Sequence, residues 1–471
     1  MIPRAIGILA LVGGLALGSG CAYYNGMYNA KRLARSAQRA EREGRSFEAS
    51  NLWGQVAVKA ESVVARHPRS KWADDAMLLR GKALQRMGNC GAAVPWLQRV
   101  TTTSTDAVLV EEATFLLGRC HEALGDTDGA REAFSRLTSS ADPVRRREAW
   151  YQRGRALRIM GDYAAALDAL GRSDHPGSRA ERAAAQAGLG RLDLAAPLLD
   201  SLLAAADTTA PWDSILALTA RHDRAAAAAL VDRLVAVVGV TPEQKARWLL
   251  EDGRRWAAVD TARAIGRMTQ ARQAGPETRP GFQARLATVQ LRLAHVESDA
   301  VLAWLSTELD SLSELGGGVA PVAARLAAAL ARVRGAADSS SLFPAQGDLR
   351  LFLAAETARD SLGAARYAGL LFRRVVEQWP TSPYAPKALL AWAQVDSARA
   401  DSLLALVRAG YADSPYLALL RGEDSPAYRQ LEDSLRVFAS RAAAPRRAPP
   451  PIPTRRGLDE DEPARRRAEP K

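Results

Sequence analysis

Aromatic residues, lysine, histidine and cysteine are all scarce in this sequence of 471 residues. Phe, Trp and Tyr together make up 6% of the chain, which is visibly rich in alanine, leucine and arginine. Such a composition favours helices and disfavours an all-β fold. The formal net charge is +12, but only seven of the 64 basic residues are lysine. Because a GC-rich genome also produces an arginine excess, the basic charge does not predict a nucleic-acid partner.

The motifs of familiar catalytic sites are missing as well. No lysine completes a Ser-x-x-Lys pattern, and neither Gly-x-Ser-x-Gly nor His-Glu-x-x-His occurs. The five histidines show no metal-ligand spacing. Gly81-Lys82 lacks the upstream glycine and the following Ser or Thr of a phosphate-binding loop. We therefore expect a protein that is not an enzyme and that holds no metal and no cofactor.

Residues 1–20 have the pattern of a bacterial secretion signal. Residues 5–17 are uncharged and apolar, a stretch too short to span a bilayer as a permanent helix, and small residues precede Cys21. This arrangement resembles a lipobox, in which the cysteine is acylated after cleavage and a short lipidated linker (21–27) follows. The alternative is an ordinary cleaved signal with an incidental cysteine. By resemblance to enterobacterial lipoproteins, Ala22 in place of Asp implies a lipid anchor on the periplasmic face of the outer membrane.

Pairs of glycines seven residues apart recur every 36 or 37 residues. An alanine lies twelve residues after the first glycine of each pair, and a large apolar residue lies sixteen residues after it. The first glycine allows two antiparallel helices to approach closely, and the second ends a helix at the turn. The pattern predicts repeated helical hairpins. The residues are Gly81, Gly88, Ala93 and Leu97; Gly118, Gly125, Ala130 and Phe134; and Gly154, Gly161, Ala166 and Leu170.

This hairpin pattern resembles the tetratricopeptide repeat, whose helix pairs stack into a superhelix with a concave groove. Gly363, Ala368 and Phe372 repeat it near the C-terminus. Connectors such as Ser382-Pro383-Tyr384 are similar to those of BamD-like outer-membrane lipoproteins. The resemblance implies an all-α fold, namely an α-solenoid of tetratricopeptide-like hairpins.

The resemblance divides the mature chain into four regions. Tetratricopeptide repeats are expected over 28–204 and tetratricopeptide-like repeats over 346–440. The region 205–345 keeps the apolar spacing of helices but departs from the consensus, which indicates degenerate hairpins. Residues 441–471 are rich in Pro and Arg, and we expect a disordered tail. A solvated tail is favoured over one that contacts peptidoglycan.

Three functions are compatible with such a chain. The first, implied by the resemblance, is a membrane-anchored scaffold that binds segments of partner proteins in its groove during outer-membrane protein assembly. The second is a cell-envelope regulator that docks peptidoglycan synthesis or division proteins. The third is a murein hydrolase with a helical superhelix, which requires a catalytic acid that nothing in the sequence selects. The sequence does not identify the partner.

Charged residues repeat together with the first glycines. An acid and a base seven residues apart lie nearly two turns from each other, so both are on one face of the first helix of each hairpin. By resemblance, that face lines the groove. There the bases either hold an acidic group of a partner or form ion pairs between neighbouring repeats. The predicted groove residues are Asp75, Leu78 and Lys82; Glu112, Phe115 and Arg119; and Glu148, Tyr151 and Arg155.

Two cysteines fall in elements that are expected to be neighbours. Cys90 begins the second helix of one hairpin, and Cys120 lies in the first helix of the next. An oxidising periplasm permits a disulfide between them. Two buried thiols that act as small apolar residues are the alternative.

Overall fold

The computed structural model describes residues 26–315, 318–342, 346–423 and 425–443, and the regular elements in these ranges are helices. The all-α prediction is therefore confirmed. The predicted signal, Cys21 and residues 444–471 of the predicted tail lie outside the described residues, whereas residues 441–443 belong to the helix Pro426–Ala443 and are not part of a disordered tail. The chain divides into two units, Met1–Gly281 and Phe282–Lys471. Within the described part of the chain, no helix is both long and apolar enough to cross a lipid bilayer.

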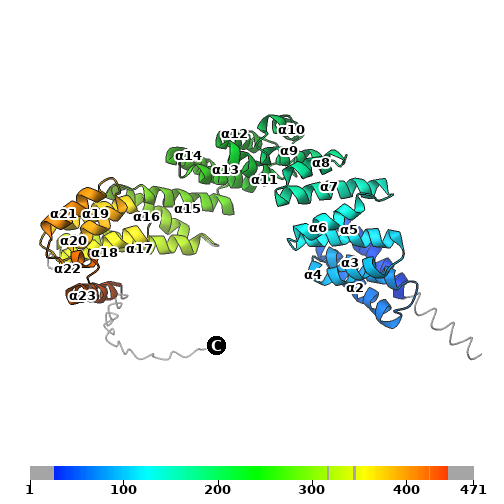
Figure 1. Cartoon of the computed structure of the whole chain (residues 1–471), viewed down its shortest axis with the longest axis horizontal. Coiled ribbons are helices and arrows are strands. Elements are labelled where there is room, and N and C mark those ends of the chain that lie inside the picture. The colour runs from blue at the N-terminus through cyan, green and yellow to red at the C-terminus, as the bar shows by residue number, and fades with distance from the viewer. Residues whose placement is uncertain (1–25, 316–317, 343–345, 424, 444–471) are drawn as a thin grey trace, which may run out of the picture. The chain divides into compact units, whose positions relative to one another are not determined.

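Unit 1 consists of antiparallel helical hairpins (Figure 1). Residues 26–42 are helical and form the first hairpin with α2 (Ser46–Arg66). Hairpins continue through the region 205–281, whose sequence departs from the consensus. The further pairs are α3 (Ala73–Arg86) and α4 (Cys90–Thr103), α5 (Ala107–Ala123) and α6 (Thr127–Leu137), α7 (Pro143–Met160) and α8 (Tyr163–Gly171), α9 (Ser178–Gly188) and α10 (Leu192–Ala204), α11 (Trp212–His222) and α12 (Arg224–Val235), and α13 (Pro242–Trp256) and α14 (Thr261–Ala274).

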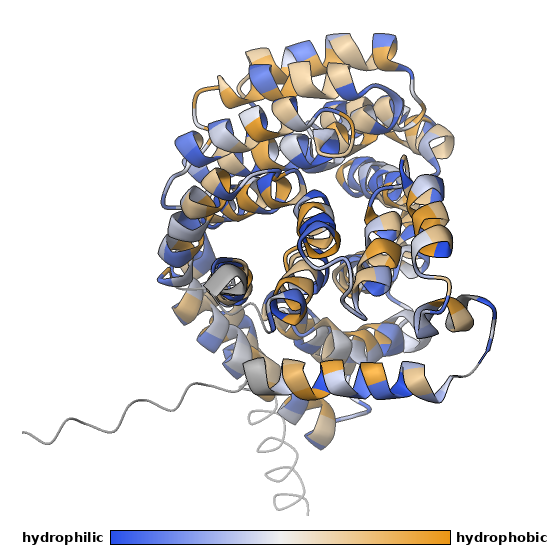
Figure 2. Cartoon of the chain, turned by 90° about the vertical axis from the view of Figure 1, so that its left-hand side faces the viewer, coloured by the Kyte–Doolittle hydropathy of each residue, from blue (hydrophilic) through white to orange (hydrophobic). Residues whose placement is uncertain are grey.

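Unit 2 is also built from helices that pack on their neighbours in the chain. Helix α15 begins just before the unit boundary. Figure 2 shows that the helices carry hydrophobic and hydrophilic residues side by side, as expected of helices that bury one face. The helices are α15 (Arg279–Ala294), α16 (Asp299–Ser313), α17 (Ala320–Leu342), α18 (Gly347–Asp360), α19 (Ala365–Gln378), α20 (Ala385–Val395), α21 (Ala400–Gly410), α22 (Pro415–Leu420) and α23 (Pro426–Ala443).

The first glycine of each pair lies where the two helices of a hairpin approach most closely. A Cβ atom added to Gly118 would lie 2.7 Å from the ring of Phe134, closer than real Cβ atoms approach other atoms. The large apolar residue sixteen positions on therefore occupies the space that glycine leaves. The same relation holds for Gly81 with Leu97 and for Gly154 with Leu170.

The second glycine of each pair ends the first helix in a left-handed conformation. The φ angles at these turns lie between 65° and 88°, a region that is costly for residues with a Cβ atom. The alanines that follow are buried, so both predicted roles are confirmed. The turn glycines are Gly44, Gly88, Gly125, Gly161, Gly190 and Gly363, and the buried alanines are Ala49, Ala93, Ala130, Ala166, Ala195 and Ala368.

A serine occupies six of the connections between hairpins. In each of them its hydroxyl oxygen accepts a hydrogen bond from the backbone N–H two residues later, which fixes the chain before the next helix begins. Among these six serines, only Ser70, Ser382 and Ser414 lie in connectors with the combination of proline and aromatic residue seen in the sequence. The pairs are Ser70 and Trp72, Ser104 and Asp106, Ser140 and Asp142, Ser173 and His175, Ser382 and Tyr384, and Ser414 and Tyr416.

Cys90 and Cys120 are joined in a disulfide in the structure. Their Cα atoms are 5.0 Å apart, and the bond links the first residue of α4 to α5. It therefore connects the second helix of one hairpin to the first helix of the next, as the spacing suggested.

Candidate partner-binding face

The first helices of consecutive hairpins in unit 1 pack directly on one another. Helix α3 contacts α5, α7 contacts α9, and α9 contacts α11, and the ion pair between Arg155 and Glu122 joins α7 to α5. The first helices therefore form one layer of these hairpins. We call the polar side of this layer the first-helix face. Its residues are Lys82, Glu112, Arg119, Glu122, Glu148, Tyr151 and Arg155.

Acidic and basic residues on this face pair between neighbouring hairpins. The ammonium nitrogen of Lys82 on α3 lies 2.7 Å from a carboxylate oxygen of Glu112 on α5. One hairpin earlier, Lys31 lies 2.9 Å from Asp75. These contacts agree with the second alternative of the sequence analysis, in which the charged residues form ion pairs between neighbouring repeats. The acids of successive hairpins are therefore paired and do not form a row of unpaired charges alongside the bases.

Glu122 is the centre of a second ion-pair cluster. Arg155 on α7 approaches one of its carboxylate oxygens to 3.1 Å, and Arg119 on α5 approaches the other to 3.4 Å. Arg155 also lies 3.7 Å from Glu181 on α9, which pairs in turn with the buried Arg158. The cluster thus runs across three consecutive first helices.

The electrostatics of this cluster follow from its partial burial. Burial raises the pKa of Glu122, and the positive charges of Arg155 and Arg119 lower it in part. Burial also raises the pKa of Tyr151. The Tyr151 ring stacks on His175 with 3.9 Å between ring centroids, and His175 lies 3.4 Å from Glu148. No acid or base of this face is therefore isolated from an opposite charge or a polar partner.

The predicted apolar strip of the groove needs correction. Leu78 is only 6% exposed because it packs into the core around α3, α4 and α5. Phe115 is half-buried and packs edge to face against Phe134 of α6. Only Tyr151 stays among the charged residues of the face. The spacing placed all three residues on one side of the helix, but that side also faces the neighbouring hairpin.

Sequence reasoning missed Glu122, Glu181 and His175. Glu122 lies three residues after Arg119, a spacing that places both on one face of α5, and this was the available signal. The pairing of Glu181 with Arg158 joins α9 to α7 across a connection, and no short-range pattern predicts it.

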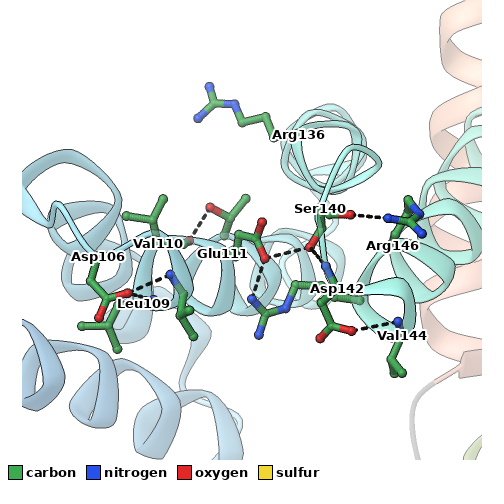
Figure 3. A network of polar contacts seen from close by, with 12 residues as sticks. Asp106, Leu109, Val110, Glu111, Arg136, Ser140, Asp142, Val144 and Arg146 are labelled. Carbon is green, nitrogen blue, oxygen red and sulfur yellow. Dashed lines mark hydrogen bonds and ion pairs between the residues drawn. The ribbon is translucent and has the colours of Figure 1, made fainter.

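A further polar network fixes α5 against α7 at the other end of the face (Figure 3). A carboxylate oxygen of Glu111 accepts hydrogen bonds from the Ser140 hydroxyl and from Arg145, each at 2.8 Å. Arg146 donates to the Ser140 carbonyl at 2.6 Å. Asp106 and Asp142 accept hydrogen bonds from the backbone N–H groups of Val108 and Val144, in the first turns of α5 and α7. These contacts tie the start of α7 to α5.

Two adjoining cavities lie around α19 in unit 2, and the sequence analysis did not predict them. Their volumes are about 630 and 190 Å³, and both are lined by Glu297, Leu370 and Arg373. The larger cavity is also lined by Trp392 and Arg399. Arg373 is paired with Glu377 at 2.7 Å, so its charge is already compensated.

The family comparison matches two of the hairpins that carry the first-helix face. The tetratricopeptide-repeat model matches residues 112–141 and, in a second form, residues 148–173. The chain contains tetratricopeptide repeats. These two tetratricopeptide matches fall on α5–α6 and α7–α8. No curated protein sequence matches the chain.

Several solved structures resemble this chain at low sequence identity. A tetratricopeptide repeat protein from Parabacteroides merdae is 15% identical, with a TM-score of 0.38, 55% of this chain covered and 98% of that chain. The apo form of RapI is 13% identical, with a TM-score of 0.39 and coverage of 72% and 97%. The TPR2AB domain of yeast Sti1 in complex with pHSP90 is 14% identical, with a TM-score of 0.21 and coverage of 60% and 89%.

Proposed function

We propose that this tetratricopeptide repeat chain is a non-catalytic scaffold, lipid-anchored at the periplasmic face of the outer membrane, that binds segments of partner proteins on its first-helix face. We further propose that it serves outer-membrane protein assembly. The observation that supports binding is the exposure of paired arginines. The side chains of Arg119 and Arg155 are 40% and 35% exposed although both contact Glu122.

Each arginine carries five N–H donors, and the ion pairs to Glu122 and Glu181 use only some of them. The remaining donors are available to a carboxylate of a partner segment, for which the guanidinium geometry is well suited. The ion pairs within the cluster hold the two side chains in place, so less conformational entropy is lost on binding. A partner segment with acidic groups is therefore the expected occupant.

The first prediction tests this face by replacing Arg119 and Arg155 with glutamine. Glutamine keeps an N–H donor toward Glu122 but removes both positive charges. We expect partner capture to weaken about tenfold or more, because charge-assisted hydrogen bonds contribute roughly 1.5 to 3 kcal/mol each. Capture is measured in cells with a photo-crosslinking amino acid in place of Gln85, which occupies the position in α3 that Glu122 occupies in α5.

The matched control replaces Arg131 and Arg136 of α6 with glutamine. These arginines are 42% and 66% exposed and pair with acids of their own helix. The control therefore removes the same two positive charges as the Arg119→Gln, Arg155→Gln variant, but away from the first-helix face. Equal capture by the two double variants would refute the assignment. Mass spectrometry of the captured proteins then separates an assembly role from docking of peptidoglycan synthesis or division proteins. Clearing of purified sacculi in a zymogram would instead favour a murein hydrolase.

The second prediction concerns Cys21. If this cysteine is acylated, Cys21→Ser removes the acylation site and releases the chain from the membrane fraction, because acyl chains contribute about 0.8 kcal/mol per buried CH₂ group. Membrane fractionation and mass spectrometry of the N-terminal peptide check this. An acylated Cys21→Ser protein in the membrane fraction would contradict the anchor.

A further inference from the structure

The first described helix carries a row of four exposed arginines. We call Arg32, Arg35, Arg39 and Arg42 the basic stripe. Their spacing of three, four and three residues keeps them on one side of the helix. The opposite side is buried and is made mainly of alanine: Ala30, Ala34, Ala37 and Ala40, with Met27 at its start.

No arginine of the basic stripe forms an ion pair with a residue in the described part of the chain. The acids nearest in sequence have other partners. Glu41 accepts a hydrogen bond from the indole N–H of Trp53 at 2.7 Å and lies 3.5 Å from Arg86. Glu43 pairs with Arg45. The stripe therefore differs from the first-helix face, where every base has an acid beside it.

An aromatic side chain continues the stripe toward the N-terminus. Tyr28 lies four residues before Arg32, on the same side of the helix, and is 54% exposed. Tyrosine is favoured at membrane–water interfaces because its ring is apolar and its hydroxyl is polar.

The stripe also lies close to the proposed lipid anchor. Cys21 lies five positions before the first described residue, Gly26, and this stretch of chain can span at most about 17 Å. The stripe itself is about 15 Å long, since ten residues of helix separate Arg32 from Arg42. An acyl chain on Cys21 would therefore hold the basic stripe within reach of the lipid headgroups.

We propose that the basic stripe binds the anionic phospholipid headgroups of the membrane, so that the helix over residues 26–42 lies along the membrane surface. This inference builds on the lipid anchor of the proposed function. Arginine guanidinium groups suit phosphate oxygens, and rows of basic residues beside a membrane anchor bind acidic lipids. A lipid surface fits better than an acidic protein segment, because the stripe is straight and no apolar residue lies among the arginines on that side of the helix.

The test measures binding of the full chain to vesicles of phosphatidylcholine alone and to vesicles that also contain phosphatidylglycerol. Cys21→Ser is the background, so that acyl chains do not retain the protein on every vesicle. The quantity is the ratio of the two partition coefficients. Any apolar contribution of the N-terminal residues is common to both vesicle types and cancels in this ratio.

Replacement of Arg35 and Arg39 by glutamine is expected to lower the ratio about tenfold or more, because each basic residue near an anionic surface contributes to binding. The control replaces Arg182 and Arg221, which are also exposed and lie in α9 and α11. The control should keep the wild-type ratio, and added salt should lower the wild-type ratio.

An unchanged ratio in the Arg35→Gln, Arg39→Gln variant would overturn the proposal, as would an equal loss in the control. An acidic partner protein would then be the better occupant of the stripe. Failure of the lipid anchor has a separate signature, since it appears as membrane retention of Cys21→Ser in cells. The vesicle ratio decides the role of the stripe in either case.

Discussion

Replacing Arg267 by methionine is expected to lower the free energy of unfolding of the hairpins around α12–α14 by about 3 to 5 kcal/mol, because it breaks a buried ion pair. The Nε atom of Arg267 on α14 lies 2.8 Å from a carboxylate oxygen of Asp252 on α13. The side chain of Asp252 is fully buried and that of Arg267 is 9% exposed. Arg267 also binds Asp232 of α12, at 2.9 Å for one N–O pair.

The loss should depend on pH in a defined direction. Burial raises the pKa of Asp252, and the charge of Arg267 counteracts this. Without Arg267 the pKa rises further. A carboxyl group whose pKa is raised by folding favours the folded state when protonated, and this stabilisation is lost as pH rises. The deficit of Arg267→Met is therefore largest near neutral pH and shrinks as the solution becomes acidic.

Asp252→Asn in the Arg267→Met background is the control, since it removes the buried charge while nearly keeping the shape. More than half of the lost stability should return. Urea unfolding and hydrogen exchange of α13 and α14 provide the measurements. If the single and double variants were equally unstable, the cost would lie in lost packing and not in the buried charge.

The hairpins could be predicted from the sequence because their determinants are local. Gly118 and Phe134 are both within one hairpin, and their spacing directly reports the close approach of its two helices. The off-consensus hairpin α13–α14 keeps a variant of this signal. A Cβ on Gly253 would lie 3.0 Å from Met268, fifteen residues on, but Asp260 replaces the turn glycine. Without that second glycine only the apolar spacing of the helices indicated this hairpin, as part of the degenerate region.

The candidate site was only partly predictable, because arginine side chains are long enough to choose among several acids. The spacing placed Arg119 and Glu122 on one face, yet it could not indicate that Arg155 of the next hairpin also binds Glu122. The ion pair between Arg267 and Asp252 could not be predicted for the same reason. Asp and Arg are abundant in this chain, so which of them pair depends on how neighbouring helices are aligned along their axes. That alignment cannot be predicted from the sequence alone.

Removing the disulfide between Cys90 and Cys120 is expected to lower the free energy of unfolding of the α3–α6 hairpins by about 3 to 4 kcal/mol. The bond closes a loop with a sequence separation of 30, which restricts the unfolded chain. Both residues are buried, so an oxidised and a reduced protein differ little in packing. The effect therefore reports mainly the cross-link.

The measurement compares hydrogen exchange in oxidised and reduced wild-type protein, with thiols counted under denaturing, non-reducing conditions. Exchange should accelerate in α4 and α5 and remain unchanged in α13 and α14, because each hairpin of a repeat array is stabilised mainly by its neighbours. The double variant Cys90→Ala, Cys120→Ala serves as the control and should not respond to reductant. Two free thiols in the untreated protein, or equal exchange in α4 and α5 before and after reduction, would show that the hairpins are held together by packing alone.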